Sequence, residues 1–196
     1  MALWGATDAD ESKPKWLTTE QKKEVLATTA GWVVEAGSTM TGNDNTSSTP
    51  EVLVAAGGLT TSLGAATITG AEWITTTADK SDGFTLSIRV RYNEAVDVAV
   101  SNPTIAVTNS NAGSGSGRGP HTLTYASGTG SNELVFSLAI AAANAATNAD
   151  DVLSIAAQNI TLASSSTIKD AGTATNSEVA ISSAQGTACG TITVTA

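Results

Sequence analysis

The sequence predicts a mainly β protein, in which a β-sandwich follows an N-terminal extended arm, a short helix and a small β region. Charged residues make up 14% of the chain, while Thr, Ser, Ala, Gly and Asn are abundant, and this mixture favours short strands and tight turns. From Phe84 to Tyr92, large apolar residues alternate with Thr, Ser and Arg. That period of two predicts a strand with one buried face.

Two units fit the length and the distribution of residues. A chain of 196 residues has room for a sandwich of about 100 residues and a smaller unit. Residues 1–35 hold ten Asp, Glu, Lys or Arg residues and three of the four tryptophans. Repeated β segments begin near Ala66, so we predict an N-terminal docking unit over residues 1–60 and a sandwich over residues 61–196.

The N-terminal unit contains three predicted elements. Residues 10–15 are polar and broken by proline, which favours an extended arm. Thr18 and Gln21 form a capping-box pattern, which predicts a helix of two to three turns. Residues 31–37 and 51–57 are apolar runs bounded by glycine, and they could pair as a long-looped hairpin.

The sandwich should contain short strands separated by turns. Residues 109–119 are low in complexity and rich in glycine, which predicts an exposed loop. Trp73 lies in an alternating stretch and is most simply a core or inter-domain residue. Beside residues 84–92, the predicted strands are 96–100, 104–107, 121–125, 134–140, 152–155, 160–162, 178–181 and 191–195.

The composition excludes several classes of partner and cofactor. A formal net charge of −9 with scattered cations argues against binding nucleic acid. The N-terminus lacks the pattern of a secretory signal and no stretch is long and apolar enough for a membrane span, so we expect synthesis in the cytoplasm and no membrane partner. One cysteine, Cys189, and one histidine, His121, cannot form a zinc cluster, and we expect no cofactor.

Three phrases give the C-terminal part a family resemblance. They are residues 92–96 (YNEAV), 125–136 (YASGTGSNELVF) and 166–172 (STIKDAG). In this order they resemble the bacterial immunoglobulin-like repeats of large adhesins and surface proteins, over a little under half of the chain. The resemblance implies an immunoglobulin-like β-sandwich and no chemistry.

The first 60 residues resemble a different group of proteins. The phrases MALWG (1–5), KPKWL (13–17), AGWV (30–33) and EVLVA (51–55) are similar to the N-terminal region of virion structural proteins of T4-like cyanophages and marine phages. The two resemblances together imply a phage virion protein, expected to be a capsid decoration protein held non-covalently on the capsid lattice. Its expected partners are the major capsid protein or other virion subunits, with many copies on one particle.

Four N-terminal residues are candidates for contact with a partner: Trp4, Trp16, Leu17 and Trp32. An extended arm of about 17 residues cannot bury Trp4 and Trp16 by itself, and tryptophan is enriched among interface hot spots. These residues would therefore anchor the chain to a neighbouring subunit. Alternatively, the arm folds back over the β domain.

No residue pattern indicates an enzyme. His121 begins a strand after a glycine-rich loop and is expected at the rim or exposed. Asp150 and Asp151 are expected in a turn before a strand, and Glu94 and Asp170 should accept backbone N–H bonds near turns. We therefore predict no catalytic residue and no metal ligand. The alternatives to capsid decoration are a tail, baseplate fibre or collar component, and a carbohydrate-binding adhesin module.

Overall fold

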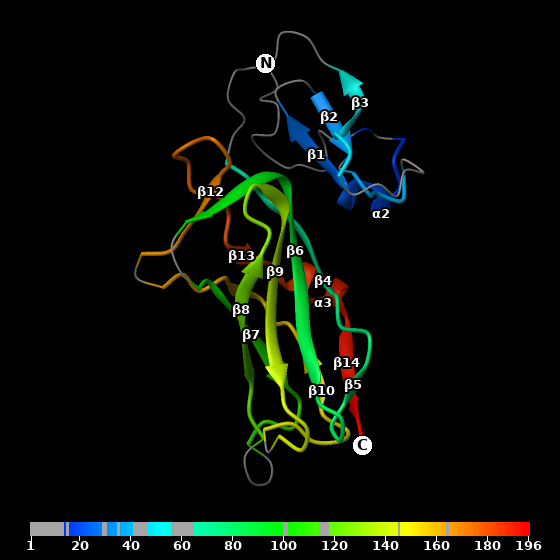
Figure 1. Cartoon of the computed structure of the whole chain (residues 1–196), viewed down its shortest axis with the longest axis vertical. Coiled ribbons are helices and arrows are strands. Elements are labelled where there is room, and N and C mark those ends of the chain that lie inside the picture. The colour runs from blue at the N-terminus through cyan, green and yellow to red at the C-terminus, as the bar shows by residue number, and fades with distance from the viewer. Residues whose placement is uncertain are drawn as a thin grey trace.

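The computed structural model describes residues 14, 16–28, 31–34, 36–40, 47–55, 65–99, 102–113, 118–144, 146–163 and 165–196. Within these ranges the protein is mainly β, with a three-stranded sheet, a nine-stranded sheet and a two-stranded sheet. The small sheet lies at one end of the large one (Figure 1). Trp4 and nearly all of the predicted arm lie outside the described residues.

The N-terminal unit consists of helix α2 and three strands. These are α2 (Thr19–Lys23), β1 (Val25–Thr28), β2 (Gly31–Val34) and β3 (Glu51–Ala55), with the sheet order β1-β2-β3. All pairs are antiparallel, and Trp32 of β2 pairs with Val54 of β3, as the predicted hairpin requires. Leu17, Val25, Trp32 and Val34 form a small buried core.

Helix α2 is shorter than the sequence predicts. Its capping box is present, since Thr18 Oγ1 accepts from the Gln21 backbone and Gln21 Oε1 accepts from the Thr18 backbone. The helix ends after five residues, because Val25 and Leu26 pair with Val34 and Val33 in β1 and are buried there. Tertiary pairing of a β-branched residue thus overrides the local helical pattern.

The large sheet forms the sandwich. Its order is β12-β6-β9-β8-β7-β10-β14-β5. The ninth strand, β4, also pairs with β6, along residues 88–92, whereas β12 pairs with residues 96–99. A two-stranded sheet, β11-β13, and helix α3 complete this part of the chain. The bounds are β4 (Ile68–Trp73), β5 (Ala78–Asp79), β6 (Phe84–Ala99), β7 (Thr104–Asn109), β8 (His121–Ser127), β9 (Ser131–Ile140), β10 (Val152–Ser154), β11 (Gln158–Asn159), β12 (Thr167–Asp170), β13 (Ala180–Ile181), α3 (Ser183–Cys189) and β14 (Thr191–Thr195).

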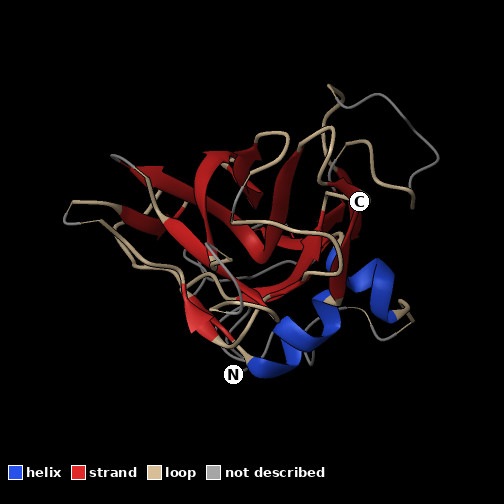
Figure 2. Ribbon diagram, turned by 90° about the horizontal axis from the view of Figure 1, so that it is seen from below, coloured by secondary structure: helices blue, strands red, loops and turns tan. Residues whose placement is uncertain are grey.

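Two features curl this sheet into a sandwich-like fold. Strand β7 pairs with β8 through residues 104–107 and with β10 through residues 108–109, so the sheet turns at β7. Strand β6 pairs with β4 in its first half and with β12 in its last four residues, with a bulge against β9 between Arg91 and Val96. The core lies inside the curl, and the predicted mainly β, sandwich-like fold is confirmed (Figure 2).

The alternating residues of β6 occupy this core as predicted. Leu86, Ile88, Val90 and Tyr92 are fully buried. Trp73 is partly buried against the core, and its Nε1 donates to the Gly190 carbonyl at 3.2 Å.

Further elements differ from the sequence predictions, among them the predicted strand 96–100, which continues residues 84–92 as part of β6. Residues 160–162 form no strand, and Thr161 makes a single bridge with Thr104. Helix α3 was not predicted, although Ser182 and Gln185 form a capping box there. Gly186 of α3 lies so close to Ile155 that an added Cβ would meet the Ile155 carbonyl oxygen at 2.6 Å. The helix therefore packs directly against the backbone of the neighbouring segment.

Candidate functional site

The candidate docking residues separate into one exposed and two buried side chains. Trp16 is 66% exposed, whereas Leu17 is 5% and Trp32 is 1% exposed. Leu17 anchors the start of α2 in the small core beside Trp32, so Trp16 is held on the outer surface of the N-terminal unit. Trp32 supports the sheet from inside and offers no surface to a partner in this conformation.

Strand β3 presents a second accessible feature of this unit. Among the described strands it pairs with β2 alone, so its other edge carries backbone donors and acceptors without a neighbouring strand. Val52 on β3 is 51% exposed. An exposed edge strand of this kind is suited to pairing with a strand of another subunit.

A cluster of charged side chains joins the N-terminal unit to the sandwich. Lys23 Nζ on α2 lies 2.8 Å from Glu20 Oε2 and 3.1 Å from Glu72 Oε1 on β4. Across β6 and β9, Arg91 Nε lies 2.7 Å and Arg89 Nη1 3.2 Å from the Glu133 carboxylate. These pairs link the helix, three strands and both units.

Ionisation in this cluster follows from the pairing. Burial opposes ionisation of Glu72, but the hydrogen bond from Lys23 and the charges of Arg91 and Arg89 outweigh it and lower the pKa of Glu72. The hydrogen bond to Glu20 is the largest cause of a raised pKa at Lys23. The lowered pKa of Glu72 and the raised pKa of Lys23 both favour the charged forms of this pair.

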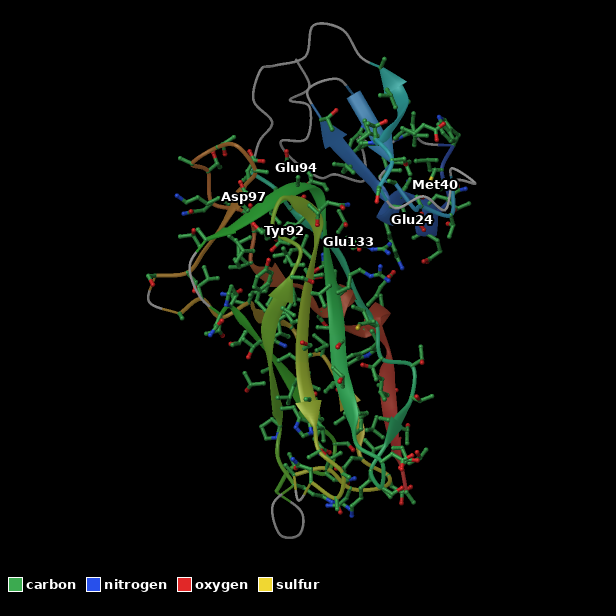
Figure 3. The ribbon with its side chains drawn as sticks, in the orientation of Figure 1. Glu24, Met40, Tyr92, Glu94, Asp97 and Glu133 are labelled. Carbon is green, nitrogen blue, oxygen red and sulfur yellow. The ribbon has the colours of Figure 1, made fainter. Side chains whose placement is uncertain are left out.

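A polar cavity of about 350 Å³ lies at the same junction. In the wall of this cavity, Glu24 accepts hydrogen bonds from Ser38 and Thr39. Figure 3 shows Glu24 and Glu133 on the two sides of the junction. The cavity is lined by Glu24, Ala36, Gly37, Ser38, Thr39, Arg89, Arg91, Asn132 and Glu133. Both guanidinium groups are already paired with carboxylates, so the cavity suits water or a small polar molecule better than an anion.

His121 is buried rather than at the rim, so the sequence expectation for its exposure was wrong. It is 6% exposed, and its Nε2 lies 3.1 Å from Thr147 Oγ1. Burial lowers the pKa of His121, against the opposing charge of Asp151. This contact ties the start of β8 to the loop that holds Thr147.

Asp150 and Asp151 occupy the predicted turn but play different parts. Asp150 has a φ of 68°, and Asp151 is fully buried. Asp151 accepts from Asn109 Nδ2 and from the Asn148 backbone, each at 2.8 Å, and Arg118 Nη1 lies 3.2 Å away. Asp151 therefore fastens the end of β7 and the loop that follows it to the loop before β10.

Glu94 departs from the predicted turn geometry. It is 2% exposed, and neither carboxylate oxygen has a hydrogen-bond partner among the described residues. Burial, with a smaller contribution from the charge of Asp170, raises the pKa of Glu94 to about 8. Asp170 is 5% exposed and accepts from the Thr173 hydroxyl at 3.1 Å. Among the described residues no backbone N–H donates to Glu94, so this expectation was wrong.

Two other observations concern possible chemistry. Burial raises the pKa of Cys189 to about 11, so its thiol is unreactive near neutral pH. Within the described ranges, no three or more His, Cys, Asp or Glu side chains are grouped to hold a metal. In the same ranges no helix is long and apolar enough to cross a membrane.

The chain was compared with protein families, curated proteins and solved structures. No family model matches the chain, and neither curated proteins nor solved structures show a significant match.

Sequence reasoning missed the charged cluster at the junction. Arg89 and Arg91 alternate with apolar residues, so their position on the outer face of β6 could be predicted. Their partners could not, because Glu72 and Glu133 become neighbours only through the register of β4 and β9 against β6.

Proposed function

We propose that this chain is a structural protein of a phage virion, a capsid decoration protein that attaches through its N-terminal unit and projects its sandwich outward. The observation that carries the proposal is Trp16, a large aromatic side chain left 66% exposed beside a small core of Leu17, Val25, Trp32 and Val34. Exposed tryptophan is costly in water and is typical of interface hot spots.

The sandwich supports a passive role. Its core is closed by its own strands, and its charged junction residues are paired among themselves. The net charge of −9 suits a solvated outer surface that repels nucleic acid. Attachment would rest on the Trp16 anchor, on strand addition at β3, and on avidity from many copies.

The aromatic residues of the sandwich argue against a glycan-binding module. Tyr92 and Phe136 are fully buried, and Tyr125 packs edge-on against Phe136 with ring centroids 6.0 Å apart. Among the described residues of the sandwich, the large hydrophobics that are exposed are Ile74 and Leu162, which are aliphatic. No aromatic ring in the described part of the sandwich is fully exposed as a platform for stacking on a sugar.

Trp16→Ala tests the proposal. We expect the variant to bind purified particles of the encoding phage at least about 30-fold more weakly, the effect of losing about 2 kcal/mol at a hot spot. Thermal unfolding should stay unchanged, because the side chain is exposed. Co-sedimentation of labelled protein with particles measures the binding.

Ile74→Ala is the matched control, since it removes a comparably exposed apolar side chain from the sandwich. Deleting residues 2–17 should abolish attachment while the sandwich stays folded. Full attachment of Trp16→Ala and of the deletion would refute docking through this unit.

The number of copies per particle separates a capsid decoration protein from a tail component. Decoration requires many copies per particle, whereas a tail, baseplate or collar component requires few.

A further inference from the structure

The further inference concerns the polar cavity at the junction of the two units. Its N-terminal wall consists of Glu24 and residues 36–39, and its sandwich wall consists of side chains from β6 and β9. With about 350 Å³, the cavity has the volume of a small ligand site. The chemistry of the two walls therefore decides which molecule it can hold.

The charges of the sandwich wall are paired with one another. Arg91 Nε lies 2.7 Å from Glu133 Oε1, and Arg89 Nη1 lies 3.2 Å from Glu133 Oε2. The Nη2 atoms of Arg91 and Arg89 also lie 3.5 Å and 3.8 Å from Glu72 Oε2. An anion would have to displace these carboxylates, and a cation would meet a Glu133 that two guanidinium groups already neutralise.

The N-terminal wall carries a carboxylate without a cation. Glu24 is partly exposed and forms no ion pair with any described residue. Lys23, next to it in the sequence, is held by acids of α2 and β4. Glu24 instead accepts hydrogen bonds from the hydroxyls of Ser38 and Thr39, with Thr39 Oγ1 3.2 Å from Glu24 Oε1. The uncompensated negative charge of the cavity is therefore on Glu24 (Figure 3).

The groups around Glu24 offer hydrogen-bond acceptors rather than donors. A hydroxyl group has a single hydrogen to donate. Ser38 and Thr39 both donate theirs to Glu24, and Ser38 Oγ also accepts from the Met40 backbone N–H at 3.1 Å. The remaining lone pairs of Glu24 and Thr39 thus suit a ligand that donates hydrogen bonds and carries a positive charge.

We propose that this cavity binds a primary alkylammonium ion, with its N–H groups on Glu24 and Thr39. An ammonium group has three donors and no acceptor, which matches the N-terminal wall. Calcium matches it less well, because calcium takes six to eight oxygen ligands and Glu24 is the one carboxylate of the lining that arginine does not neutralise. The ion belongs either to a free aliphatic amine or to a lysine side chain of a partner. Binding here does not depend on docking through Trp16.

The test uses the full chain at pH 7.5 and low salt, titrated with butane-1,4-diamine in a calorimeter. We expect one diamine per chain, with a Kd of about 1 mM. Butane-1,4-diol, which has the same length and no charge, should give no binding heat. Glu24→Gln should bind the diamine at least about 10-fold more weakly, because it loses a charge-assisted hydrogen bond.

Glu51→Gln is the matched control, because it removes an exposed carboxylate of the same unit that does not line the cavity. It should keep the wild-type affinity. Titration with Nα-acetyl-lysine amide separates the two sources, since tighter binding than that of the diamine indicates a lysine side chain and weaker binding indicates a free amine.

Three results would overturn the proposal: no binding heat with either amine, an unchanged affinity in Glu24→Gln, or an equal loss of affinity in Glu51→Gln. Thermal unfolding shows whether Glu24→Gln is folded. If it is not, Thr39→Val takes its place, and it should weaken binding because it removes an acceptor from the same wall.

Discussion

At the scale of single residues, burial and pairing decide what each polar side chain does. Asp151 and Glu94 are both buried acids, yet Asp151 is surrounded by donors and Glu94 has none. Burial opposes ionisation of Asp151, but its hydrogen bonds to Asn148, Asn109 and Asn111 and the charge of Arg118 outweigh it and lower its pKa. The surrounding structure therefore favours the ionised form of Asp151.

Asp151→Asn should lower the free energy of unfolding by about 2–3 kcal/mol at pH 7, because its amide nitrogen would face donors that need an acceptor. A lowered folded-state pKa stabilises the protein above the ordinary pKa of Asp, and this contribution is lost as the pH falls through the folded-state value. The difference in the free energy of unfolding between the wild type and Asp151→Asn should therefore shrink below about pH 4. Urea denaturation at several pH values measures this.

Asp150→Asn is the control for this prediction. Asp150 has a φ of 68°, which Asn also tolerates, and the substitution should change stability by less than about 0.5 kcal/mol. An equal loss in both variants would show that the turn, and not the Asp151 network, is responsible.

At the scale of elements, turn glycines fix how β8 joins β9. Gly128 has a φ of 115°, and an added Cβ would meet the Glu133 carbonyl oxygen at 1.9 Å. Gly130, in the same turn, has a φ of 81° with nothing within 4 Å of an added Cβ. An alanine at position 130 would therefore meet only the strain of a positive φ, whereas an alanine at position 128 would meet this strain and a steric clash.

Gly128→Ala should destabilise the protein by about 3 kcal/mol or more, whereas Gly130→Ala should cost about 1 kcal/mol, the strain of a positive φ alone. Chemical denaturation of both variants beside the wild type measures the difference. Similar costs at the two positions would contradict the predicted clash with Glu133.

At the scale of the whole molecule, ion pairs cross the junction at which β1 of the N-terminal unit lies against β6 of the sandwich. The hydrophobic clusters of the N-terminal unit and the sandwich are separate, and Lys23 reaches Glu72 at the junction. Partly exposed pairs of this kind contribute only about 0.2–1 kcal/mol each and are weakened by salt. The arrangement of the units should therefore respond to single charge changes.

Lys23→Glu should loosen the junction, because it places a carboxylate beside Glu20 and Glu72. We expect a larger radius of gyration in small-angle X-ray scattering at low salt, with the wild type approaching the same value at high salt. Lys80→Glu makes the same change of net charge away from the junction, where Lys80 Nζ donates to Asn148, and should leave the dimensions unchanged. Identical scattering of Lys23→Glu and wild type at low salt would contradict an ionic junction.

The sequence by itself determined the mainly β class, the long strand beginning at Phe84, the capping box at Thr18 and the pairing of residues 31–34 with 51–55. These features depend on local periodicity and on side chains close together along the chain. Only the tertiary structure decided that Val25 begins a strand, that Trp32 and His121 are buried, and that Glu94 has no partner. Those outcomes depend on strand register and curl, which bring together residues far apart in the sequence.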